Sequence, residues 1–235
     1  PIIVLVGIYL GIESAVHRDT IIDHATRTIA IIGWSLPTFW LGLVLIAIFF
    51  SQYGLLPPGD RVGQTAYDAV RSPTFINYTG FNTIDALLNG QLWIFWDALR
   101  HLVLPVATLV TIQIALIVRV MRSSMLEALG KSYIITAKAK GLSKKEVINK
   151  HARRNALIPA ITLAGILTAG MLTGVVITET IFHINGIGRF AAQAAIQVDG
   201  PAVLGFALFS CIVFITANLL VDIVYAYVDP RIRLG

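Results

Sequence analysis

Five apolar segments limit the folds open to this chain. They cover residues 1–16, 28–53, 101–121, 157–178 and 202–227. A helix of about 20 apolar residues crosses the hydrocarbon layer of a bilayer, and a single span satisfies its own backbone hydrogen bonds in lipid only as a helix. The segments therefore predict an all-α, polytopic membrane helical bundle with five spans. Pro37 and Pro105 interrupt two of the segments, which membrane helices tolerate when neighbouring groups satisfy the freed carbonyl.

Composition supports a membrane protein. Of the 235 residues, 56% are hydrophobic and 13% are charged, and this charged share is about half that of a typical soluble domain. The net charge of +5 does not indicate a nucleic-acid partner, because the cations are confined to particular loops. The single cysteine, Cys211, makes an internal disulfide impossible.

The distribution of cations predicts the orientation of the spans. The loops rich in lysine and arginine are 17–27, 122–158 and the tail that contains Arg231 and Arg233, whereas 54–100 and 179–201 are poorer. By the positive-inside rule the first three are cytoplasmic. This alternation places Pro1 outside, at the start of an apolar stretch that has no features of a signal peptide. We therefore expect six spans in the natural protein, with the first span of six missing from this sequence.

The segment 122–158 has the start and stop signals of two helices joined by a tight corner. Apolar residues recur every fourth position at Met125, Leu129, Tyr133 and Ala137, which predicts one face of a helix. Gly141 is suited to end that helix in the left-handed conformation.

A second helix is predicted directly after this corner. Ser143 and Glu146 have the spacing of a capping box, and Leu142 and Val147 have that of a hydrophobic staple. We expect this helix to continue to Ala156. Proline disfavours helical geometry in the residue before it and is favoured in the first turn of a helix. Pro159 is therefore expected to separate this helix from the next span and to open that span.

The two helices would form a rigid basic knob. Its cations are Lys138, Lys140, Lys144, Lys145, Lys150, Arg153 and Arg154. The residues alone leave three interpretations open: an amphipathic hairpin on anionic lipid, a docking site for a cytoplasmic partner, or charge that only sets topology.

A longer signature runs through this loop. It consists of Tyr133, Thr136, Ala137, Lys138, Ala139, Lys140, Gly141 and Leu142, followed by His151, Ala152, Arg154, Asn155, Ala156, Leu157 and Pro159. Further stretches lie in the matching order at 35–46, 54–60, 98–105, 122–133, 177–182 and 218–233. Together they resemble permease subunits of ATP-binding-cassette importers, in particular the dipeptide/oligopeptide branch of the binding-protein-dependent transport inner membrane component family. The stretch 182–189 departs from the family, which usually has a Trp-Pro-Gly turn there.

The resemblance implies a type I ABC importer permease fold. Residues 1–235 would form one transmembrane domain, and 122–158 would be a cytoplasmic hairpin that couples it to separate ATPase subunits. The implied coupling residues are Tyr133, Thr136, Ala137, Lys138, Ala139, Lys140, Gly141, Leu142 and Ser143. The implied structural residues of the hairpin are Glu146, Val147, Arg154, Asn155 and Pro159. We expect Ala137, Ala139, Gly141 and Leu142 to pack into a groove of the ATPase, and a bulky residue at Gly141 to uncouple transport.

The implied function is half of the translocation pathway of an ATP-driven importer for di- or oligopeptides or similar solutes. The implied partners are a second homologous permease subunit, two cytoplasmic ATPase subunits that bind ATP and magnesium, and an extracytoplasmic substrate-binding protein. No nucleic-acid partner is implied. The location would be the inner or plasma membrane of a prokaryote, with the C-terminus in the cytoplasm.

The chain itself is expected to bind no cofactor and not to be an enzyme, because it has no Walker A loop. The alternative function is a stand-alone secondary transporter or channel, although the spans are poor in the acidic residues that a coupling-ion site would need. A membrane-embedded hydrolase would need a catalytic constellation that the sequence does not contain.

Four residues are candidates for the translocation pathway. Glu179 follows the segment 157–178 at its outer end, where a peptide's amino group could pass, and Thr180 is beside it. A plain interface charge is the competing interpretation of Glu179. Gly170 and Gly174 have the spacing of a Gly-x-x-x-Gly face, which would line the seam between two permeases or serve ordinary packing.

Other ionisable residues have structural interpretations. Arg119 and Arg122 close the third apolar segment and are expected to extend toward the membrane surface. Asp222 is expected to be a structural partner for a neighbouring helix. His101 is interpreted as a capping or interface residue and not as a metal ligand.

Overall fold

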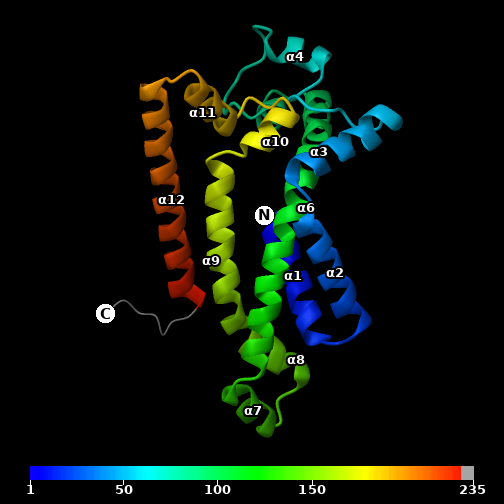
Figure 1. Cartoon of the computed structure of the whole chain (residues 1–235), viewed down its shortest axis with the longest axis vertical. Helices are drawn as coiled ribbons and strands as arrows, with labels where there is room; N and C mark the ends of the chain where they lie inside the picture. Colours follow the sequence, from blue (N-terminus) through cyan, green and yellow to red (C-terminus); the bar gives the residue numbers. More distant parts are fainter. Residues whose placement is uncertain (229–235) are drawn as a thin grey trace. The chain divides into compact units, whose positions relative to one another are not determined.

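The computed structural model describes the backbone of residues 1–228 and the side chains of residues 1–225. Arg231, Arg233 and the end of the stretch 218–233 lie outside the described residues. The described chain is helical, with no strand between residues 1 and 228 (Figure 1). Its helices are α1 (Ile2–Val16), α2 (Ile21–Ser35), α3 (Thr38–Ile46), α4 (Gln64–Val70), α5 (Asn82–Leu88), α6 (Leu92–Leu129), α7 (Ser132–Ala139), α8 (Lys144–Glu146), α9 (Arg153–Leu172), α10 (Val176–Ile181), α11 (Ile187–Ile196) and α12 (Gly200–Val228). Two π-helical segments, η1 (Ala47–Gln52) and η2 (Val147–Ala152), complete the described elements.

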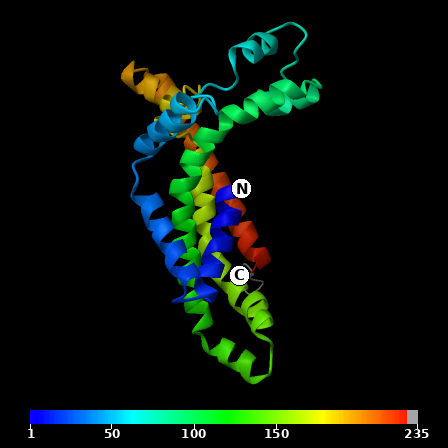
Figure 2. The same ribbon diagram turned by 90° about the vertical axis from the view of Figure 1, so that its right-hand side faces the viewer.

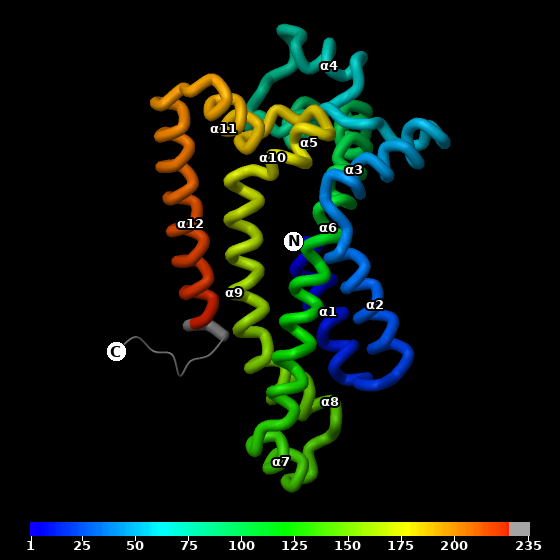
Figure 3. The backbone as a smooth tube through the Cα atoms, viewed as in Figure 1, coloured from blue at the N-terminus to red at the C-terminus, as the bar shows by residue number. Residues whose placement is uncertain are grey.

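The helices form two compact units. The first unit contains Pro1–Leu36, Val110–Thr173 and the chain from Asp199 onward, and the second contains Pro37–Leu109 and Gly174–Val198. In the first unit α1 packs against α2 and α9. In the same unit α9 and α12 lie side by side (Figures 1 and 3).

Glycines let the helices of the first unit approach closely. A Cβ atom on Gly11 would lie 2.6 Å from the Cβ of Met121, and one on Gly33 would lie 2.7 Å from the carbonyl oxygen of Thr111. A Cβ on Gly165 would overlap the Val221 side chain of α12. Small residues are common where membrane helices pack closely. They bring α1 and α2 against α6, and α9 against α12.

The second unit has its own small core. Val62, Ala66, Phe75, Ala86, Ile94 and Ala98 are buried together there. The buried carboxylate of Asp85 accepts hydrogen bonds of 2.8 Å from the Thr79 amide, 2.8 Å from the Thr79 hydroxyl and 2.9 Å from the Gly80 amide. Burial alone would raise the pKa of Asp85, but these hydrogen bonds outweigh it and hold the pKa below its ordinary value. The loop at 79–80 is thereby fixed to α5.

The all-α membrane fold is confirmed, and the number of spans stays a prediction. Three helical stretches of the described chain are long and apolar enough to cross a membrane: Leu92–Leu129, Lys144–Leu172 and Gly200–Tyr225. The pair Ile21–Ser35 and Thr38–Gln52 meets the same criterion only when the two are taken together, and Ile2–Val16 is shorter. The expected interruption of the segment 28–53 at Pro37 is a complete break between α2 and α3, and whether the two form one span stays a prediction. The residue before a proline disfavours helical geometry, and Leu36 is extended (φ −80°, ψ 128°) before Pro37.

The same rule fails at Pro159. This proline lies inside α9, which continues without a break from Arg153 to Leu172. The predicted helix boundary at 158–159 is therefore wrong. Ala156 and Ala160, on either side of the proline, are both buried in the core of the first unit, and this packing outweighs a local preference of the backbone.

The prediction that Met125 to Ala137 lie on one helix is also wrong. Helix α6 runs on to Leu129, and α7 begins only at Ser132. Glycine is a poor helix former, and the break falls at Gly130, followed by Lys131 in an extended conformation (φ −76°, ψ 151°).

Candidate functional site

The segment Ser132–Ala152, called the hairpin below, contains the corner that the sequence predicts. Gly141 has a φ of +79°. Its amide donates to the Lys138 carbonyl at 3.0 Å, and the Leu142 amide donates to the Ala137 carbonyl at 3.4 Å. These two bonds form a Schellman motif, which satisfies the last carbonyls of α7. Glycine meets the left-handed requirement at no steric cost.

The predicted capping box follows directly. The Glu146 amide donates to the Ser143 Oγ at 3.3 Å, and the Ser143 amide donates to the Glu146 Oε2 at 3.0 Å. The Ser143 hydroxyl also donates to the same carboxylate oxygen at 2.7 Å. Both ends of the corner are thus closed by hydrogen bonds within the chain. Leu142 packs on the core that contains Val147, as the predicted hydrophobic staple requires.

A continuous apolar core joins the hairpin to other helices of the first unit. The hairpin is the yellow-green segment at the bottom of the view in Figure 2. The residues of this core, called the hairpin core below, are Ile12, Ala15, Met121, Met125, Ala128, Ile134, Ala137, Val147, Ala152, Ala156 and Ala160. They come from α1, α6, α7, η2 and α9. Because protein cores are close-packed and transmit strain, we expect a displacement of the hairpin to be passed to α1, α6 and α9.

The outer surface of the hairpin carries most of the predicted coupling residues. Those that are exposed are Tyr133, Thr136, Lys138, Ala139, Lys140, Gly141 and Ser143, and Leu142 is partly exposed. Ile135 adds an apolar side chain that is 65% exposed. Ala137, in contrast, is only 5% exposed, so it supports the hairpin from within. The role of the exposed residues in coupling stays a prediction.

The predicted structural residues of the hairpin hold it in different ways. Val147 is 2% exposed in the hairpin core. The Asn155 side chain donates to the His151 carbonyl at 2.9 Å, which bridges the end of η2 and the start of α9. Glu146 completes the capping box, Arg154 is exposed on α9, and Pro159 lies inside that helix.

The candidate pathway residues do not form one face. Helix α9 ends at Leu172, so Gly170 lies on α9 and Gly174 follows it with a φ of +103°. The prediction of a helical Gly-x-x-x-Gly face is therefore wrong. Thr180 is exposed on α10, and its hydroxyl donates to the Val176 carbonyl at 2.7 Å.

Glu179 has structural partners in the second unit. Its carboxylate accepts from the Val175 amide at 2.9 Å and from the Arg189 amide at 2.6 Å, and its side chain lies against Gly186. The residue is 7% exposed. These bonds join α10 to the start of α11, so Glu179 has a structural task whether or not solute passes near it. A pathway role stays a prediction.

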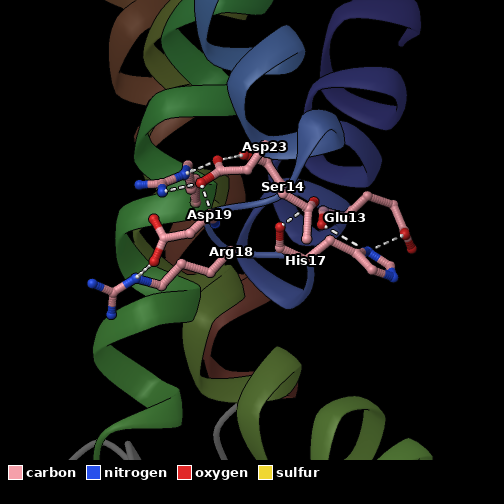
Figure 4. Close-up of polar contacts among 8 residues, drawn as sticks. Glu13, Ser14, His17, Arg18, Asp19 and Asp23 are labelled. Atoms are coloured by element: carbon pink, nitrogen blue, oxygen red, sulfur yellow. Dashed lines mark hydrogen bonds and ion pairs between the residues drawn. The ribbon is translucent and has the colours of Figure 1, made fainter.

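Sequence reasoning missed a buried charge cluster in the first unit (Figure 4). Asp23 and Arg122 form a bidentate ion pair, with the Arg122 Nε 2.7 Å from Asp23 Oδ1 and Nη2 2.7 Å from Oδ2. Arg122 therefore has a carboxylate partner within the first unit, and its extension toward the membrane surface stays a prediction. Asp23 and Arg122 each lie just outside an apolar segment, and they are 99 positions apart in sequence, so no local pattern connects them.

Other ionisable residues differ in how they are placed. The His101 Nδ1 lies 2.8 Å from the Asp97 carbonyl. Asp222 is exposed and makes no ion pair within residues 1–225. In that same part of the chain, no three histidine, cysteine or acidic side chains gather in a way that could hold a metal ion.

Comparison with known proteins adds a family-wide similarity. The family described as "Binding-protein-dependent transport system inner membrane component" matches residues 3–234. The "Probable D,D-dipeptide transport system permease protein DdpB" of Escherichia coli K12 is 42% identical over 231 residues, which is 98% of this chain and 66% of that protein. The "Dipeptide transport system permease protein DppB" of the same strain is 42% identical over 228 residues, 97% and 66% of the two chains.

A more distant relative gives the same picture. The "Dipeptide transport system permease protein DppB" of Bacillus subtilis 168 is 36% identical over 233 residues, 99% of this chain and 64% of that protein. The chain therefore spans about two thirds of the length of the curated relatives it matches.

Proposed function

Since this chain belongs to the family of binding-protein-dependent transport system inner membrane components, we propose that it forms half of the translocation pathway of an ATP-driven importer for di- or oligopeptides. The observation that carries the proposal is the similarity to peptide permeases along nearly the whole chain. The solute class comes from the names of those relatives. A second permease subunit, two ATPase subunits and a substrate-binding protein are the partners that this role requires.

The hairpin supplies the mechanical part of the proposal. A Schellman corner, a capping box and the hairpin core fix its shape. Its outer surface exposes Tyr133 and Ile135, and part of Leu142, next to lysines. In our proposal this surface faces the cytoplasm and docks on an ATPase subunit. Movement of the ATPase then shifts α1, α6 and α9 together, because the hairpin core joins them.

The competing function, a secondary transporter, would place a coupling ion at a buried acidic residue. The buried acids of the described chain are Asp23, Asp85 and Glu179, and each carboxylate already accepts hydrogen bonds from the protein. These partners favour structural tasks for the three residues, and hence the ATP-driven importer.

The test is uptake of a radiolabelled dipeptide in a bacterial strain that lacks its own dipeptide permeases. The full-length protein is produced together with a sister permease, ATPase subunits and a substrate-binding protein from its source organism. We expect uptake that requires the ATPase subunits, and co-purification of those subunits with the tagged permease. Uptake that persists without the ATPases and follows the proton gradient would instead identify a secondary transporter.

A further inference from the structure

The corner between α1 and α2 is tied to α6 by one buried carboxylate. Asp23 is the third residue of α2 and is completely buried. Besides the two hydrogen bonds from Arg122, its carboxylate accepts one of 2.6 Å from the Ser14 hydroxyl and one of 3.1 Å from the Asp19 amide (Figure 4). Four hydrogen bonds satisfy both carboxylate oxygens, so the site is closed to a further ligand. The cluster is therefore a joint between helices and not a binding site.

The joint fixes three elements in one arrangement. Ser14 belongs to α1, Asp23 to α2 and Arg122 to α6, and Asp19 lies in the corner with a φ of +62°. A planar guanidinium that meets a carboxylate through two parallel bonds fixes orientation as well as distance. Buried ion pairs are a weak source of net stability, and conformational specificity is one reason for keeping them.

The joint lies next to the hairpin core. Arg122 follows Met121 and precedes Met125 on α6, and both methionines are completely buried in that core. Ser14 lies between Ile12 and Ala15 of α1, which belong to the same core. No α2 side chain belongs to the hairpin core. The ion pair therefore links α2 to that core through α6.

We propose that the Asp23–Arg122 ion pair is a positioning device that makes α2 move with the hairpin and α6. The inference rests on the proposed function for its consequence in transport, but the mechanical link itself is a property of this chain. Without the bidentate contact, α2 would keep its glycine contact near Thr111 and lose its fixed orientation at the end beside the hairpin. Movement of the ATPase would then still displace α6 and α9, but it would displace α2 only in part.

The discriminating variant is Arg122→Lys. Lysine keeps the positive charge that the buried carboxylate needs but cannot make two parallel bonds. Arg119→Lys is the matched control, because Arg119 is exposed one helical turn earlier on α6. Asp23→Asn is a second variant that removes the charge from the other side of the pair.

Two measurements are made on the assembled full-length complex. The first is dipeptide uptake per ATP hydrolysed, which we expect to fall at least about fivefold in Arg122→Lys, the lower end of ordinary coupling free energies. The second is the distance between spin labels at Arg27→Cys on α2 and Asn149→Cys on η2, in a Cys211→Ser background. We expect a narrow distance distribution in the parent and in Arg119→Lys, and a broadened one in Arg122→Lys.

Each outcome decides the proposal. Unchanged coupling or an unchanged distance distribution in Arg122→Lys overturns it. Loss of the complex from the membrane in both Arg122→Lys and Asp23→Asn also overturns it, because the pair would then serve folding and not positioning. If the parent complex transports no peptide, the proposed function fails, and the spin-label distances still decide whether the pair links α2 to the hairpin.

Discussion

The conformation of Gly141 gives the sharpest prediction for the hairpin. Its φ of +79° lies in the left-handed region, which costs other L-residues about 1–2 kcal/mol. An added Cβ would have no atom within 4 Å, so the Cβ of a larger residue meets no steric clash inside this chain. In Gly141→Val the whole penalty is therefore conformational, and it lowers the population of the native corner about 5- to 30-fold.

Gly141→Asn separates this effect from contact with a partner. Asparagine visits the left-handed region routinely, so it keeps the corner while adding bulk at the same place. If corner geometry is what matters, the asparagine variant should retain most of the dipeptide uptake per ATP hydrolysed and the valine variant should lose it. If an ATPase subunit packs directly on the backbone of Gly141, both variants should fail.

Hydrogen exchange at the Leu142 amide provides an independent measurement. This amide closes the Schellman motif on Ala137, and it should exchange about tenfold faster in Gly141→Val than in the parent. The permease should still insert in the membrane in both variants, because the cost is small compared with the stability of a folded domain. Wild-type uptake and unchanged Leu142 exchange in Gly141→Val would refute the reasoning.

Three further predictions concern stability. Gly165→Ala should destabilise the packing of α9 on α12 by about 1–3 kcal/mol, because the added Cβ would overlap Val221. Gly170→Ala is the control and should be neutral, because the space around Gly170 is open. Adding Val221→Ala should restore the stability of the Gly165→Ala variant, and thermal unfolding in detergent measures all three. Glu179→Ala should leave two backbone amides without their acceptor, at about 1–3 kcal/mol each, and speed proteolysis between α10 and α11, with the glutamine variant intermediate. The pKa of Asp85 is lower in the folded protein than in the unfolded chain, so its stabilisation should be complete above about pH 4 and be lost as the pH falls through the folded-state value. Hydrogen exchange of residues 76–90 measured against pH should show this loss, and Asp85→Asn should abolish it.

The sequence predicted best those features that depend on residues close together along the chain. The left-handed Gly141 and the reciprocal bonds of Ser143 and Glu146 follow from local backbone and side-chain chemistry, and the structure contains both. The apolar segments likewise predicted the helical membrane fold, because lipid leaves few other ways to satisfy the backbone. Nothing outside the local sequence is needed for these conclusions.

Features that depend on tertiary packing were predicted poorly. Pro37 and Pro159 carry the same local signal, yet the helix ends at the first and continues through the second, where Ala156 and Ala160 are buried. The Asp23–Arg122 pair joins α2 to α6 across 99 positions of the sequence, and no local pattern connects the two residues. From a carboxylate near the end of an apolar segment one can predict that it has a polar partner, but not which residue that partner is.

The π-helical segment η2 has a consequence for how the hairpin is aimed. In a π turn each backbone hydrogen bond spans one residue more than in an α turn. Deleting one residue from a regular α-helix rotates everything beyond the deletion by about 100°. A π turn absorbs its extra residue, so a deletion within Val147–Ala152 that restores α-helical bonding should leave the outer surface of the hairpin facing nearly the same way. The same deletion within the regular part of α9 should instead turn that surface by about a quarter of a circle, so related chains can gain or lose one residue in η2 without changing where the hairpin points.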